Sequence, residues 1–116
     1  MSHKYLAKVE FILEMIENIE TVCNRHSGVS KALDDEVEGR AALLMFLLQI
    51  GESLKKIDVN DVAKYDLDRE IKGAYDVRNF IAHDYEGVNI IVIEDILKDN
   101  LPELKIKMQK LFDDWS

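Results

Sequence analysis

The chain has 116 residues, of which 47% are hydrophobic and 33% charged, with one proline and five scattered glycines. This balance excludes a disordered or collagen-like chain and predicts one globular domain over residues 1–116. The net charge of −8 argues against a surface that holds long nucleic acid by counterion release, but not against a site that grips one or two phosphates.

The sequence has the character of a cytoplasmic protein without a membrane segment. Its lone cysteine, Cys23, has no partner for an intramolecular disulfide. The N-terminus leads into a charged amphipathic stretch rather than an apolar signal core. The longest strongly apolar stretch, residues 41–50, is much shorter than the roughly 20 residues of a membrane-spanning helix.

Helical periodicity dominates the first half of the chain. Apolar residues at spacings of three and four predict an amphipathic helix from Tyr5 to Cys23, closed by Gly28 in the left-handed conformation. Side chains able to cap a helix predict a second long helix that starts between residues 31 and 36 and runs to about Ile57. Apolar residues cover every side of it between positions 41 and 50, so it should lie at the centre of the molecule.

The second half continues the helical pattern. Short turns over residues 59–65 precede a third helix, capped by Asp66 or Asp68 and ending between residues 82 and 84. The run Ile90–Ile93 has the β-branched composition of a strand, but helical spacing continues beyond it and no partner strand exists. A last helix spans about residues 100–115. The predicted fold is all-α, an antiparallel bundle of four to five helices.

Arg78 stands near the middle of the apolar face of the third helix. On an ideal helix that face carries Ile71, Ala74, Tyr75, Val77, Ile81, Ala82 and Tyr85. One explanation is that Arg78 pairs with a carboxylate such as Glu52 or lays its aliphatic stem on the core. The other is that it faces a cleft or a partner subunit and offers its planar set of donors to a phosphate.

Other reactive side chains lie near Arg78. Asp76, Asn79 and His83 share a polar stripe, where Asn79 can hydrogen-bond the imidazole, although His83 lies about 140° around the helix from Arg78. Tyr85 is expected on the side of Arg78, near the helix end. With three histidines at no metal-ligand spacing and no glycine-rich phosphate loop, we expect no metal site and no cofactor.

The series Arg78-Asn79-x-x-x-His83-x-Tyr85 resembles the R-x4-H-x-Y motif of the HepT-like branch of HEPN domains, toxins of bacterial and archaeal toxin–antitoxin pairs. Ile50–Leu54 resembles the "iGE.a" segment of that family's central helix, and Leu101–Leu104 the start of its last helix, so the similarity spans about residues 4–112. The resemblance implies a helical homodimer in which two copies of the motif face each other across a cleft at the interface. An arginine on an apolar face is expected where that face meets a second subunit.

The same resemblance implies a metal-independent ribonuclease. His83 would act as general base on a ribose 2′-hydroxyl or as acid to the leaving oxygen. Arg78 would stabilise the charge on the phosphorane, and Asn79 would orient the imidazole. The implied partner is an MNT-type nucleotidyltransferase antitoxin that transfers AMP to Tyr85. A bulky anionic nucleotide beside Arg78 would occupy the guanidinium and block the cleft.

Two alternatives have no ribonuclease chemistry. In the first, the domain is a non-catalytic nucleotide-binding or regulatory partner of a minimal nucleotidyltransferase, which the acidic net charge favours slightly. In the second, it is a helical dimerisation scaffold in which Arg78 is only an interfacial ion-pair residue.

Overall fold

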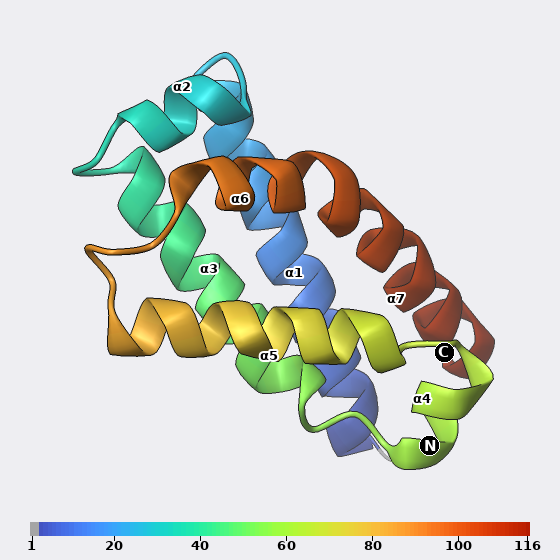
Figure 1. The fold of residues 1–116 in the computed structure, drawn as a ribbon. Coiled ribbons are helices and arrows are strands. Elements are labelled where there is room, and N and C mark those ends of the chain that lie inside the picture. The colour runs from blue at the N-terminus through green and yellow to red at the C-terminus, as the bar shows by residue number, and fades with distance from the viewer. Residues whose placement is uncertain (1–2) are drawn as a thin grey trace.

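The computed structural model describes residues 3–116, which form helices joined by short turns (Figure 1). The described part of the chain contains no strand, so the all-α prediction is confirmed. In chain order the elements are α1 (His3–Arg25), α2 (Val29–Asp34), α3 (Gly39–Leu54), α4 (Val59–Lys64), α5 (Asp68–His83), α6 (Ile90–Asp95), the π-helical turn η1 (Ile96–Asn100) and α7 (Leu101–Trp115).

The long helices pack around one aliphatic core. α1 and α3 lie side by side, α5 crosses α3 on its outer side, and α7 packs against α1 (Figure 1). The largest fully buried side chains come from α1, α2, α3, the turn before α5, and α7: Val9, Ile12, Ile16, Ile19, Leu33, Leu43, Leu44, Ile50, Leu54, Leu67, Met108 and Leu111. α5 contributes only Ile81 as a fully buried side chain, so this helix lies on the outside of the bundle.

The turn after α1 differs from the prediction by one residue. Ser27 takes the left-handed conformation, with φ of 65°, while Gly28 has φ of 131°. The amide of Gly28 donates to the carbonyl of Cys23 at 2.8 Å, which satisfies one of the free carbonyls at the helix end. Glycine is needed here because other residues rarely adopt its φ.

The long second helix predicted from residues 31–36 to Ile57 is wrong, because α2 and α3 are separate helices. Asp35, between them, accepts hydrogen bonds from the backbone amides of Glu38 (3.3 Å) and Gly39 (3.2 Å). The carboxylate therefore caps the start of α3 and stops α2 from continuing. Gly39 also approaches the carbonyl of Ala32 so closely that a Cβ would collide with it.

The later helices follow the predicted order. α5 begins at Asp68, but Leu67 stands at its N-cap position without a side-chain hydrogen bond, so the predicted cap by Asp66 or Asp68 is wrong. Ile90–Ile93 is helical as expected, and Asn89 caps α6 by accepting from the amides of two following residues. None of the helices over residues 3–116 combines the length and apolarity needed to cross a membrane.

Candidate functional site

α5 packs closely against α3 at Gly51. A Cβ added to Gly51 would lie 2.6 Å from the carbonyl oxygen of Ala74 and 2.7 Å from the Cβ of Arg78, too close for any side chain. Glycine is therefore what allows the two helices to approach at this point. The next residue of α3, Glu52, is thereby brought beside Arg78.

The guanidinium of Arg78 is held by two side chains. Its Nε donates to Oε1 of Glu52 at 2.5 Å, and its Nη1 donates to Oδ1 of Asn79 at 2.9 Å. The predicted pairing of Arg78 with Glu52 is thus confirmed, yet the Arg78 side chain keeps 27% of its surface exposed. A guanidinium has five N–H donors, and these two bonds are the ones it makes within residues 3–116, so the others remain to bind an anion.

His83 is the last residue of α5 and is exposed. The hydrogen bond predicted between Asn79 and His83 is not formed, because the amide oxygen of Asn79 accepts from Arg78. Within the described chain, the imidazole makes no hydrogen bond to another side chain or to the backbone. His83 follows Arg78 by five residues, which is about 140° around the helix, so the two side chains point to different sides of α5.

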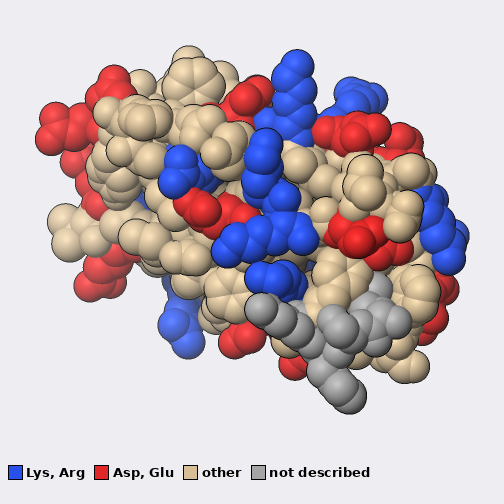
Figure 2. Space-filling view, turned by 90° about the horizontal axis from the view of Figure 1, so that it is seen from below, with Lys and Arg blue, Asp and Glu red and all other residues tan. Residues whose placement is uncertain are grey.

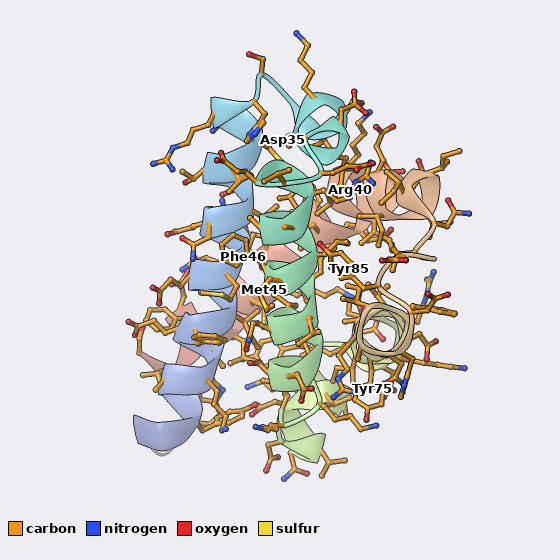
Figure 3. All side chains as sticks on the ribbon, turned by 90° about the vertical axis from the view of Figure 1, so that its left-hand side faces the viewer. Asp35, Arg40, Met45, Phe46, Tyr75 and Tyr85 are labelled. Atoms are coloured by element: carbon orange, nitrogen blue, oxygen red, sulfur yellow. The ribbon has the colours of Figure 1, made fainter. Side chains whose placement is uncertain are left out.

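Tyr85 lies beyond the helix, in a turn that follows it. The amide of Gly87 donates to the carbonyl and to Oδ1 of Asp84, both at 3.1 Å, and 46% of the Tyr85 side chain is exposed. Because α5 ends at His83, the helical spacing that predicted Tyr85 on the side of Arg78 does not extend to Tyr85. Figure 3 looks along α5 and places Tyr85 on the opposite side of that helix from Tyr75.

Tyr75 is a neighbour of Arg78 that the sequence did not single out. Cζ of Arg78 lies 5.8 Å from the centroid of the Tyr75 ring, and Nζ of Lys55 lies 4.3 Å from the same centroid. Both distances are within the range of cation–π attraction. The signal that could have found this cluster is spacing: Tyr75 precedes Arg78 by three residues on α5, and Lys55 follows Glu52 by three at the end of α3.

Several large apolar side chains are exposed on α3, near the end of α5 and at the start of α6. They are Met45 (53% exposed), Phe80 (69%), Tyr85 (46%), Ile91 (75%) and Val92 (49%). The exposure of Met45 corrects the expectation that the central helix is buried on every side. In Figure 3 α3 runs through the middle of the view with Met45 and Tyr85 on the face toward the reader.

A hollow of about 290 Å³ lies between α3, α5, η1 and α7. Its rim includes Lys107, whose Nζ donates to Oε1 of Glu70 at 2.7 Å. Arg78 and His83 line neither this hollow nor a second one between α1 and α7. Over residues 3–116, no three His, Cys, Asp or Glu side chains group in a way that could hold a metal ion.

A comparison with protein families gives one match. The family described as ribonuclease HepT-like matches residues 12–111, which is most of the chain and includes the contact between α3 and α5 and the residues from Arg78 to Tyr85. Neither the curated proteins nor the solved structures gave a match. The chain therefore belongs to the HepT-like ribonuclease family.

Proposed function

We propose that this protein is the toxin of a HEPN/MNT toxin–antitoxin pair and a metal-independent endoribonuclease whose active site is shared between two copies of the chain. Membership of the HepT-like ribonuclease family supports RNA as the substrate. The observation that carries the proposal is the Arg78 guanidinium, which Glu52 and Asn79 orient while leaving donors for a phosphate.

The proposed reaction uses proton transfer and charge stabilisation. His83 takes the proton of a ribose 2′-hydroxyl, whose oxygen attacks the adjacent phosphorus. Arg78 binds the non-bridging oxygens and stabilises the charge that grows on the phosphorane. The bond between phosphorus and the 5′-oxygen of the next nucleotide then breaks, and the protonated imidazole of His83 gives its proton to that oxygen. A 2′,3′-cyclic phosphate remains. Asn79 acts on this reaction by orienting Arg78.

A second copy of the chain is proposed because Arg78 and His83 diverge within one protomer. A two-fold dimer places the same surface of each protomer in contact, so that Arg78 of one copy can face His83 of the other. The exposed side chains of Met45, Phe80, Ile91 and Val92 offer an apolar area that such a contact would bury.

Tyr85 is proposed as the site of AMP transfer by the nucleotidyltransferase antitoxin. Its side chain is 46% exposed in a surface turn, which another enzyme can reach. The added nucleotide brings a negative charge and a bulky base to the entrance of the shared cleft. Incubation with the antitoxin and ATP should add the mass of AMP to the wild type and not to Tyr85→Phe. Equal labelling of both proteins would contradict the assignment.

Cleavage of RNA in the presence of EDTA tests the chemistry. Wild type should cleave, while Arg78→Ala and His83→Ala should each lose about a hundredfold or more in rate. Arg25→Ala, which removes an exposed arginine at the end of α1, is the matched control and should behave as wild type. Equal rates in all four proteins would refute the proposal, and loss of wild-type activity in EDTA would refute metal independence.

Co-expression of Arg78→Ala with His83→Ala tests the shared site. Half of the dimers then contain one chain of each kind, and one of the two sites in each such dimer has both an intact arginine and an intact histidine. About a quarter of wild-type activity should return. No recovery, with mixed dimers demonstrated by mass spectrometry, would mean that each protomer builds its own site.

A further inference from the structure

Tyr75 presents an aromatic surface one helical turn before Arg78. The ring is partly exposed, and its centroid lies 5.8 Å from Cζ of Arg78. A phosphate held by Arg78 therefore lies within the span of one nucleotide from the ring. Aromatic side chains beside a phosphate-binding cation are the usual means by which proteins hold single-stranded nucleic acid without reading its sequence.

Two cationic side chains, Lys55 and Arg78, lie beside this ring in a protein whose net charge is −8. Figure 2 shows Lys and Arg side chains gathered across the middle of the face that contains the C-terminal end of α3. Lys55 and Lys56 at that end, and Lys72 one turn before Tyr75, are exposed and form no ion pair within the described chain. An exposed ammonium next to an aromatic ring, with further exposed lysines on the same two segments, favours an anionic ligand that also stacks, in spite of the acidic protein as a whole.

The ammonium of Lys55, 4.3 Å from the ring centroid, occupies the place that a base would take. An exposed cation–π contact changes an equilibrium by only about twofold to fivefold. Stacking of a base on an aromatic side chain is worth about fivefold to a hundredfold or more. The exchange is therefore favourable, and the displaced ammonium of Lys55 is free to bind a phosphate instead.

From this arrangement we infer that Tyr75, Lys55 and Lys72 form the RNA-binding platform of the protein. The base of the nucleotide next to the scissile phosphate stacks on Tyr75, and the two lysines contact the flanking phosphates. The inference rests on the proposed ribonuclease function and adds to it the path of the strand, which runs from Arg78 along α5 and over the end of α3. The ligand is single-stranded RNA, because the faces of a base inside a duplex are covered by its stacked neighbours and are not open to the ring.

Binding of a fluorescein-labelled single-stranded RNA of mixed sequence, followed by anisotropy, tests the platform. The parent protein carries His83→Ala so that the RNA stays intact. Tyr75→Ala should weaken binding about tenfold, while Tyr75→Phe, which keeps the ring, should stay within about twofold. Lys55→Gln should lower the slope of log K against log salt by about 0.7, and the matched control Lys110→Gln, an exposed lysine on α7, should leave it unchanged.

The platform is overturned if Tyr75→Ala, with an unchanged circular dichroism spectrum, binds RNA as the parent does. It is also overturned if Lys55→Gln and Lys110→Gln have equal salt slopes, or if the parent binds no RNA. Cleavage assays on proteins with His83 intact distinguish failure of the RNA-binding platform from failure of the proposed ribonuclease activity. RNA that binds through Tyr75 but is never cleaved refutes the ribonuclease and leaves the platform standing. If Tyr75→Ala and wild type cleave RNA with the same kcat/KM, the platform is refuted and the ribonuclease proposal stands.

Discussion

Replacing Gly51 with alanine should destabilise the protein, although alanine is normally the better residue inside a helix. In a helix with free space, the change from glycine to alanine stabilises by about 0.5–1 kcal/mol. Gly51 has no such space, because its Cβ would meet the backbone of Ala74 and the Cβ of Arg78. The contact between α3 and α5 therefore decides the sign of the effect.

The magnitude follows from the distances. Ordinary van der Waals contact begins at 3.4 Å, whereas the added Cβ would stand 2.6 Å from the carbonyl oxygen of Ala74, so α3 and α5 must separate by up to about 0.8 Å. A backbone carbonyl cannot rotate away as a side chain can. Overpacking of this kind costs about 1–3 kcal/mol, and set against the gain in helix propensity it leaves a net loss of up to about 2.5 kcal/mol.

Urea denaturation at a fixed protein concentration measures this loss, since the stability of the proposed dimer depends on concentration. Gly73→Ala in α5 is the matched control, because nothing lies within 4 Å of the added Cβ, and it should raise the free energy of unfolding by about 0.5–1 kcal/mol. If Gly51→Ala were as stable as Gly73→Ala, the close approach at Gly51 would not constrain the two helices and the reasoning would be wrong.

Three further predictions test other parts of the fold. Asn89→Ala removes the acceptor of two amides at the start of α6 and should lower the free energy of unfolding in urea by about 1 kcal/mol. Leu111→Ala should lower it by about 2–5 kcal/mol, whereas Ile106→Ala, 71% exposed on the same helix, should change it by less than about 0.5 kcal/mol. The hydrogen bond to Asp35 raises the pKa of His26 and lowers that of the carboxyl. The stabilisation that His26 gives the folded state is complete below its ordinary pKa of 6.5 and is lost as pH rises through the raised pKa. The stabilisation that Asp35 gives is complete above its ordinary pKa of 3.8 and is lost as pH falls through the lowered pKa. His26→Gln should therefore lower the urea midpoint more at about pH 5.5 than at about pH 9, and an equal effect at both would contradict the pairing.

Sequence alone predicted those helices whose apolar pattern extends over several turns. The β-branched run Ile90–Ile93 is helical because the periodicity continues into the residues after it, and Asn89 supplies the cap. The helix that carries Arg78 and His83 ends at His83, within the predicted bounds. These features are local, so the order of residues is enough to predict them.

Features that depend on contacts between distant residues were not predictable in this way. Residues able to cap a helix occur both inside and after α2, and it is the 2.9 Å contact with His26 that helps to hold Asp35 at the start of α3. Asn79 accepts a hydrogen bond from the same guanidinium that donates to Glu52 of α3, and spacing along α5 had instead predicted a bond to His83. Lys55 follows α3 and Tyr75 lies on α5, so their contact depends on how these two helices pack.

The π-helical turn η1 determines how the buried side chains of α6 and α7 are aligned with each other. Ile93, Leu97 and Leu101 are all buried, yet each step of four residues overshoots a regular α-helical turn by about 40°. In η1 the amide of Leu101 donates to the carbonyl of Ile96, which makes this turn wider than an α-helical one. The wider turn compensates for the excess rotation, so that the row of buried side chains continues into α7. Loss of one residue between Ile96 and Asn100 would leave a regular helix with its apolar stripe still inward. This turn is thus the place where the C-terminal helices can tolerate a change in length, while a deletion inside α7 would rotate its core side chains into solvent.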